Sequence, residues 1–319
     1  MSARESETIE VAVPLSRFLM RPRRAVIASA AVAAVLAVIR WATGPRGSPD
    51  AIETEVSVRY GDIDAGGKEL LLDVYHPPPQ ATLRSAMIVL HGGGYVSGSR
   101  SDFSVVEPAR RLAEAGYVAF SIDYRLFQER DRRNAWPTPL DDAQRAVRWV
   151  RANATTYDVD PQRVGAYGVS AGAGLAAHLG VRDTRDNSDP ELADYSSRVA
   201  CVVDLAGPTD GTLASANPGD SAFAVTFFGG TIAEIPDVYR DASALPHIDE
   251  ATAPFLVVHG VQDTIVSVEH SRRLVARLRQ EGIGVDYVEL PDAGHDVFGW
   301  DRVGPLALSF LDGHLKSER

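Results

Sequence analysis

The chain has 319 residues, of which 45% are hydrophobic and 24% charged, and its formal net charge is -11. This composition is typical of a globular protein with one large domain, and it excludes a disordered chain and a membrane protein with many spans. The negative charge argues against nucleic acid binding, which needs a basic surface, and the single cysteine, Cys201, excludes an internal disulfide and a cysteine-rich metal site.

The N-terminal residues differ in kind from the rest of the chain. Residues 1–24 are a basic segment, and residues 25–42 begin with AVIASAAVAAVLAVI, which is uncharged and apolar on almost every face. This pattern predicts a transmembrane signal anchor that places the following domain outside the cytoplasm, and it disfavours an ordinary buried helix. A cleaved signal peptide is the alternative, because a run of about 22 Å is shorter than an apolar bilayer core of about 30 Å. Residues 43–53 are predicted to be a linker.

Apolar runs of strand length begin at residue 54 and alternate with helical patterns up to residue 319. Eight strands are predicted, at 54–60, 69–75, 86–91, 117–123, 163–168, 199–205, 254–260 and 285–290. Helical patterns cover 104–116, 139–154, the segment after Ser170, 268–282 and 304–316. The later apolar runs are continuous rather than alternating, as expected of parallel strands buried on both faces. Residues 54–319 are therefore predicted to form one α/β domain, with a mostly parallel eight-stranded sheet and helices on both faces.

The stretch HGGGY places three consecutive glycines directly after the predicted strand at 86–91. Glycine costs about 0.5–1 kcal/mol relative to alanine in regular structure, so the run indicates a special turn or a backbone left bare for a ligand. A phosphate-binding loop would carry G-x-G-x-x-G or a following G-K-[ST], and neither is present. The N–H groups of Gly93 and Gly94 are instead suited to bind an oxyanion, with the ring of His91 holding the loop.

The strand at 163–168 runs into GVSAG, residues 168–172, and then into a helix-forming stretch. A sharp strand-to-helix turn at G-x-S-x-G is a nucleophile elbow, in which the serine is strained and the glycines let strand and helix pack closely. A small-residue helix start is the alternative, and the strand before the motif disfavours it. Ser170 is thus the predicted nucleophile, and the N–H of Ala171 is a third predicted oxyanion donor.

A serine hydroxyl is a poor nucleophile at neutral pH and needs a base that an acid orients. His295 follows the last predicted strand, and Asp263 follows the strand before it, so both lie at carboxyl ends of strands. We therefore predict His295 as the base and Asp263 as the acid. The alternatives are a surface turn for His295, a helix cap for Asp263, and Asp204, which ends an earlier strand, as the rival acid.

Residues 207–250 have no clear secondary-structure pattern and are rich in Gly, Pro and Asp. A structureless segment of this length is uncommon inside a compact domain unless it has a function. We expect these residues to form a cap or lid.

The motifs HGGGY, GVSAG, HGVQD and AGH, together with SIDYRL and FFGGT...YRDAS, resemble those of α/β-hydrolase esterases of the hormone-sensitive-lipase type and their bacterial feruloyl/acetyl-esterase-like (BD-FAE-like) relatives. The resemblance covers most of residues 54–316. It implies an α/β-hydrolase fold and a serine carboxylic-ester hydrolase that acts through Ser170, His295 and Asp263 and a covalent acyl-enzyme. Larger lipase-like members carry a helical N-terminal cap, whereas here the linker enters the first strand almost at once. A small cap and short- to medium-chain acyl esters are therefore expected.

Two other functions stay open on this evidence: an amidase or peptidase of the formamidase type on the same fold, and a non-catalytic, membrane-tethered binding protein. We expect a small-molecule ester as substrate and no nucleic acid partner. We expect no metal and no organic cofactor, because the histidines show no H-E-x-x-H or similar spacing. The expected location is a membrane anchor with an extracytoplasmic catalytic domain, or secretion after signal cleavage.

Overall fold

The computed structural model describes residues 52–63, 69–79, 84–215 and 218–316. The basic segment at 1–24, the predicted anchor at 25–42 and most of the linker at 43–53 lie outside these residues. Across the described ranges, no helix has the length and apolar character needed to cross a membrane.

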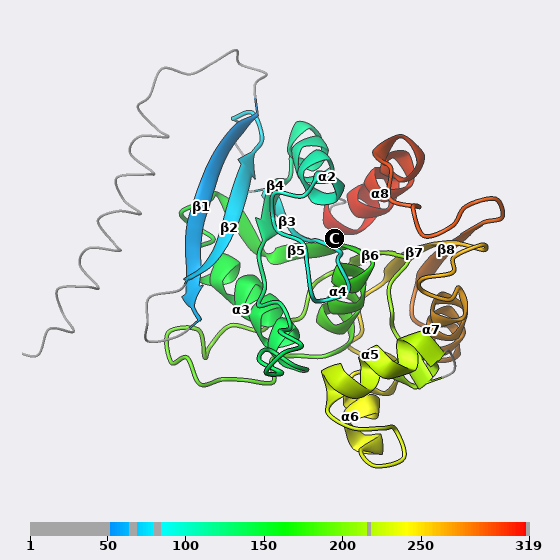
Figure 1. The fold of residues 1–319 in the computed structure, drawn as a ribbon. Helices are drawn as coiled ribbons and strands as arrows, with labels where there is room; N and C mark the ends of the chain where they lie inside the picture. Colours follow the sequence, from blue (N-terminus) through cyan, green and yellow to red (C-terminus); the bar gives the residue numbers. More distant parts are fainter. Residues whose placement is uncertain (1–51, 64–68, 80–83, 216–217, 317–319) are drawn as a thin grey trace, which may run out of the picture. The chain divides into compact units, whose positions relative to one another are not determined.

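Within the described residues, eight strands form one sheet in the order β1-β2-β4-β3-β5-β6-β7-β8 (Figure 1). β2 runs antiparallel to its neighbours β1 and β4, and all other neighbouring strands are parallel. The strands are β1 (Glu53–Asp62), β2 (Glu69–His76), β3 (Arg84–Leu90), β4 (Val118–Ile122), β5 (Val159–Val169), β6 (Val202–Leu205), β7 (Phe255–Gly260) and β8 (Val285–Leu290). Each overlaps the apolar run that predicted it, and the predicted α/β-hydrolase fold is confirmed.

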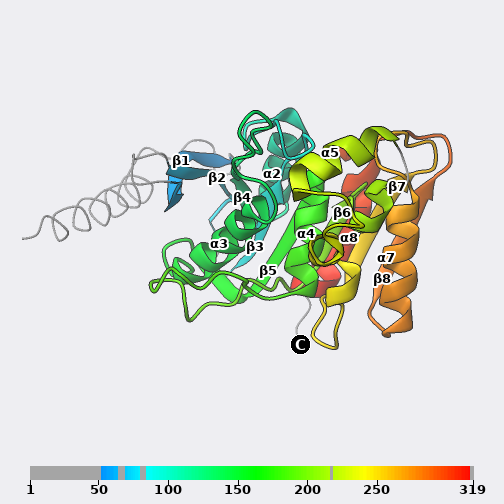
Figure 2. The same cartoon turned by 60° about the horizontal axis from the view of Figure 1, so that its bottom comes forward.

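Helices cover both faces of this sheet (Figures 1 and 2). On one face pack α3 (Thr138–Ala152), α4 (Ala171–Val181) and α7 (Glu269–Gln280). On the other pack α2 (Phe103–Glu114) and α8 (Trp300–Leu315). α7 buries residues such as Leu274 and Leu278, four positions apart, as an amphipathic helix does. α4 is instead buried all round, which its run of Ala, Gly and Leu permits.

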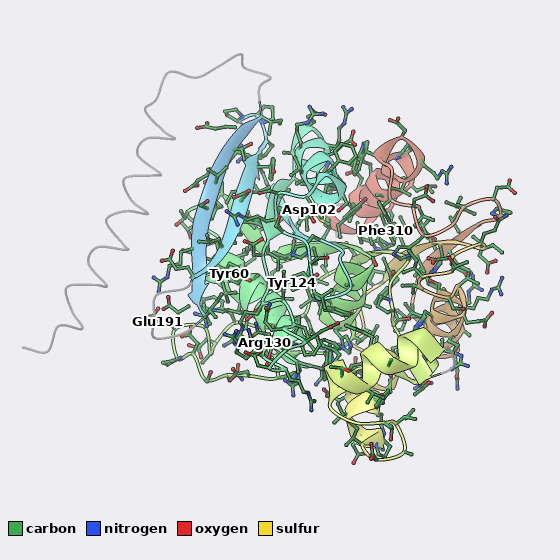
Figure 3. The ribbon with its side chains drawn as sticks, viewed as in Figure 1. Tyr60, Asp102, Tyr124, Arg130, Glu191 and Phe310 are labelled. Carbon is green, nitrogen blue, oxygen red and sulfur yellow. The ribbon has the colours of Figure 1, made fainter. Side chains whose placement is uncertain are left out.

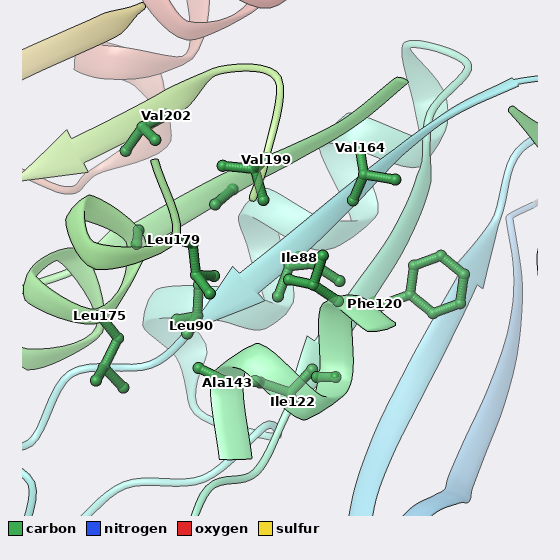
Figure 4. Close-up of a cluster of buried hydrophobic side chains, with 14 of the residues drawn as sticks. Ile88, Leu90, Phe120, Ile122, Ala143, Val164, Leu175, Leu179, Val199 and Val202 are labelled. Carbon is green, nitrogen blue, oxygen red and sulfur yellow. The ribbon is translucent and has the colours of Figure 1, made fainter. Parts of the chain in front are cut away.

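The strand side chains divide between two core layers, because successive residues of a strand point to opposite faces. In β3, Ile88 and Leu90 pack in the layer with α3 and α4, whereas Met87 and Val89 pack in the layer with α2 and α8. Figure 4 shows the first layer, with Ile88 and Leu90 in it. Each of these side chains is fully buried, which stabilises the fold by about 1.5–3 kcal/mol relative to exposure. Burial on both faces explains why these strands are unbroken apolar runs.

The segment predicted as a cap, residues 207–250, contains more regular structure than its sequence indicates. It carries α5 (Pro218–Phe228), α6 (Pro236–Asp241) and the 3-10 turns η1 (Gly211–Ser215) and η2 (Leu245–His247). α5 and α6 are drawn in yellow-green to yellow in Figure 2. The apolar residues of α5 are spread around the helix rather than gathered on one side, so periodicity gave no helical signal.

Candidate active site

Ser170 lies at the sharp turn between β5 and α4. Its backbone has φ 54° and ψ -121°, a region that a residue with a side chain rarely adopts, at a cost of about 1–3 kcal/mol. The flanking glycines permit this turn: a Cβ atom at Gly168 would lie 2.3 Å from the carbonyl oxygen of Gly172, and one at Gly172 would lie 2.3 Å from that of Leu90. The sequence motif therefore folds into the sharp, strained turn that the elbow prediction requires.

His295 and Asp263 come from the loops after β8 and β7, and the structure brings both to Ser170. The Nε2 atom of His295 lies 2.8 Å from the Oγ atom of Ser170. Its Nδ1 atom lies 2.6 Å from the Oδ2 atom of Asp263. The side chain of His295 is 16% exposed, whereas that of Asp263 is fully buried. A serine, an imidazole and a carboxylate thus form one hydrogen-bonded chain, open to solvent at the serine end.

The carboxylate of Asp263 is held by four donors. Its Oδ1 atom accepts the backbone N–H groups of Ile265 and Val266, both at 2.8 Å. Its Oδ2 atom faces His295 and, at 3.2 Å, the Nε2 atom of His259. Burial by itself raises the pKa of Asp263, but the hydrogen bonds from the two imidazoles and the two N–H groups outweigh it and hold the pKa below the ordinary value. Asp263 is therefore ionised at neutral pH.

Asp204, the rival acid, lies elsewhere. Its Oδ1 atom accepts the backbone N–H of Gly207 at 2.9 Å, and its Oδ2 atom is buried without a hydrogen-bond partner among the described residues. Burial raises the pKa of Asp204 to about 6. In the part of the chain that the structure describes, the carboxylate that contacts His295 is that of Asp263.

The glycine loop, residues 91–95, lies directly against Ser170. A Cβ atom at Gly92 would lie 3.3 Å from the Cβ atom of Ser170. Gly93 and Gly94 have φ 105° and 59°, so both adopt conformations that favour glycine. Among the described residues, the N–H groups of Gly93, Gly94 and Ala171 have no hydrogen-bond acceptor. The three predicted oxyanion donors are thus left available for a ligand, as an oxyanion hole requires.

The side chains of His91 and Tyr124 hold this loop in place. The ring of His91 is buried and stacks on Tyr124 at a centroid separation of 4.2 Å, and the Tyr124 hydroxyl donates to the His91 carbonyl at 2.9 Å. Figure 3 labels Tyr124. Burial lowers the pKa of His91, which keeps the ring neutral, and its Nδ1 atom lies 2.7 Å from the Gly92 carbonyl. This geometry suits the predicted anchoring role of His91.

Two residues without a predicted role, Tyr124 and His259, contact residues of this site. Tyr124 lies in the loop after β4. His259 begins the motif HGVQD, which Asp263 ends, so the motif itself is the signal that places His259 near the acid.

The described residues contain no group of three or more His, Cys, Asp or Glu side chains arranged to hold a metal ion. The expected lack of a cofactor stays a prediction. The chemistry that the side chains themselves offer is nucleophilic attack by Ser170, with His295 as proton acceptor.

Comparisons with known proteins find esterases among the relatives of this chain. A family model described as BD-FAE matches residues 72–278. The esterase LipC of Mycobacterium tuberculosis is 35% identical over 262 residues, which is 78% of this chain and 62% of that protein. The chain spans about three fifths of the length of the curated relatives it matches.

Solved structures share the fold. A truncated carbohydrate esterase from gut microbiota superposes with a TM-score of 0.72 at 24% identity, covering 85% of this chain and 99% of that one. The butyrate-bound esterase Est2 of Thermogutta terrifontis gives a TM-score of 0.68 at 25% identity, covering 84% of this chain and 95% of that one.

Proposed function

The chain belongs to the BD-FAE family, and from that membership we propose that it is a serine carboxylesterase that cleaves short- to medium-chain acyl esters. One observation carries the proposal: the hydrogen-bonded chain from Ser170 through His295 to Asp263, with contacts of 2.8 Å and 2.6 Å. A serine, a base and an ionised acid in this order are the requirements of nucleophilic acyl transfer.

In the proposed reaction, the Oγ atom of Ser170 attacks the ester carbonyl while the Nε2 atom of His295 takes the hydroxyl proton. Asp263 stabilises the imidazolium that forms and keeps its Nδ1–H in place. The carbonyl oxygen becomes an oxyanion, which the N–H groups of Gly93, Gly94 and Ala171 bind. When the tetrahedral intermediate collapses, the ester C–O bond breaks and His295 returns the proton to the leaving alcohol. Water, activated by the same imidazole, then hydrolyses the acyl-enzyme and regenerates Ser170.

The preference for shorter acyl groups is supported by aromatic packing beside the glycine loop. Phe227 of α5 stacks on Tyr95, the residue after the three glycines, at 5.1 Å between ring centroids. Phe127 packs edge-on against Phe227 at 5.2 Å. We expect these packed rings to limit the room for a long acyl chain beside the glycines. Est2 of T. terrifontis, which shares the fold, is described with propionate and with butyrate bound.

We further propose that residues 25–42 anchor the protein in a membrane with the catalytic domain outside the cytoplasm. The apolar run preceded by arginines supports this, by the preference of basic residues for the cytoplasmic side. Secretion after cleavage is the alternative that the same residues allow.

The ester hydrolase proposal is tested with p-nitrophenyl esters from acetate to palmitate and with matching anilides. We expect the highest kcat/KM on acetate or butyrate, a much lower value on palmitate, and little anilide cleavage. Ser170→Ala is expected to abolish turnover and labelling by a fluorophosphonate while the circular dichroism spectrum is unchanged, since only the nucleophile is lost. Labelling that persists in this variant removes Ser170 from the mechanism, and equal turnover of anilides favours an amidase.

A further inference from the structure

A second histidine lies behind the acid of the site. His259 is the next-to-last residue of β7, and its side chain is fully buried, as is that of Asp263. Its Nε2 atom lies 3.2 Å from the Oδ2 atom of Asp263, the same oxygen that faces His295. Asp263 is thus placed between two imidazoles.

The contacts of His259 determine which ring nitrogen carries the proton. Its Nε2 atom faces two acceptors, the carbonyl oxygen of Val266 at 2.9 Å and the Asp263 carboxylate, so Nε2 carries the hydrogen. Its Nδ1 atom lies 2.6 Å from the hydroxyl of Ser271, which is fully buried on α7. In the neutral ring, Nδ1 accepts the Ser271 hydroxyl proton. This bond favours the tautomer whose Nε2–H points at Asp263.

The same ring also fixes the turn that carries the acid. The Asp263 carboxylate accepts N–H groups from Ile265 and Val266, and the carbonyl of Val266 is bound in return by His259. The buried ring of His259 thus connects β7 to Ser271 of α7 and to the loop that carries Asp263.

We propose that His259, held in one tautomer by Ser271, is a positioning residue that orients the Asp263 carboxylate toward His295. The inference rests on the proposed esterase function. His259 contacts no reacting atom and acts only through Asp263. Without its Nε2–H, the Oδ2 atom keeps a single imidazole donor, and the turn after β7 loses the bond to Val266.

The test compares the full-length chain with four variants, using p-nitrophenyl acetate. His259→Leu removes both ring nitrogens at similar volume, and His259→Gln keeps an N–H donor. Ser271→Ala removes the partner of Nδ1. His178→Leu is the matched control, because His178 is also buried and, among the described residues, its one hydrogen bond is to the carbonyl of Ala242. Thermal unfolding and circular dichroism report whether each variant is folded.

We expect His259→Leu to lower kcat about 10- to 100-fold with KM nearly unchanged, the range for losing a hydrogen bond to a charged group. His259→Gln is expected to recover most of this loss, Ser271→Ala to show a smaller decrease, and His178→Leu to keep kcat within about threefold. If His259→Leu fails to fold, Ser271→Ala decides by the same measurement of kcat. An unchanged kcat in folded His259→Leu, or in Ser271→Ala where His259→Leu does not fold, overturns the proposal.

A double-mutant cycle separates positioning from general stabilisation. In the background of Asp263→Asn, His259→Leu should cause no further decrease in kcat, because residues that act as a unit are not additive. The same fold-loss in both backgrounds overturns the proposal.

The downfield proton resonance of His295 Nδ1–H provides a readout that needs no turnover. It should shift or broaden in His259→Leu and stay in place in His178→Leu, and an unchanged resonance in His259→Leu overturns the positioning role. If the wild-type protein cleaves no ester, the esterase proposal fails, and this resonance still decides the role of His259.

Discussion

Asp263→Asn tests whether the proton arrangement of the site is the one proposed. The Oδ1 atom of Asp263 accepts two backbone N–H groups at 2.8 Å, which can only donate, whereas the imidazoles at Oδ2 can change tautomer, so we expect the amide oxygen of an asparagine at the Oδ1 position. The amide NH2 group then takes the place of Oδ2, 2.6 Å from the Nδ1 atom of His295. Because this group is a donor, Nδ1 must accept and the imidazole proton moves to Nε2. Nε2 then points a hydrogen at Ser170 and has no lone pair to take the hydroxyl proton.

The expected loss in kcat is about 10⁴-fold, which corresponds to about 5.4 kcal/mol of transition-state stabilisation. KM should change little, since the Asp263 side chain is fully buried and touches no substrate. Initial rates on p-nitrophenyl butyrate measure both constants.

Asp292→Asn is the matched control for this change, an exposed aspartate three residues before His295 that is expected to keep wild-type rates. A variant Asp263→Asn that retains more than about a tenth of the wild-type kcat refutes the reasoning, as does a larger loss in Asp204→Asn.

Two further predictions concern stability and the N-terminus. Burial raises the pKa of Asp204 to about 6, so the folded state binds this proton more tightly than the unfolded chain, and stability falls as the pH rises from about 4 to 6. The free energy of unfolding of Asp204→Asn, measured by urea titration, should therefore equal that of the wild type near pH 4. At pH 7 it should exceed the wild-type value by about 2–3 kcal/mol. Parallel pH profiles of the two proteins would contradict this. For the N-terminus, mass spectrometry of washed membranes should find the intact start of the chain. A start near residues 43–46 in the exported soluble fraction would show cleavage instead, and an intact chain found only in the cytosol would exclude both.

Local sequence patterns predicted the strands of the sheet and the place in the chain of each candidate site residue. A continuous apolar run indicates a strand buried on both faces, as Met87 to Leu90 prove to be in β3. The elbow at Ser170 spans one turn, so five residues encode it. The carboxyl ends of parallel strands meet at one edge of a sheet, and for this reason chain order alone predicted that Ser170, Asp263 and His295 come together. Their catalytic roles stay predictions.

The helices in residues 207–250 are an example of what local patterns missed. The apolar residues of α5 have no preferred side, because they pack in more than one direction, including against Tyr95 of the glycine loop. A helix stabilised by tertiary contacts on several sides lacks the periodic signal of an amphipathic one.

The sequence by itself determined the chain order of the three candidate residues: a serine, then an aspartate, then a histidine, each after a strand. Only the tertiary structure shows the contact between Asp263 and His295 and the residue that lies behind Asp263. The sequence predicted Asp263, which follows a strand, and left Asp204, near the end of the neighbouring strand, as the alternative. The loop after β7 turns Asp263 toward His295 and His259, whereas Asp204 lies within β6 and bonds to the N–H of Gly207. These differences arise from the direction of side chains and from contacts between distant residues such as His259 and Ser271, which form only when the chain has folded.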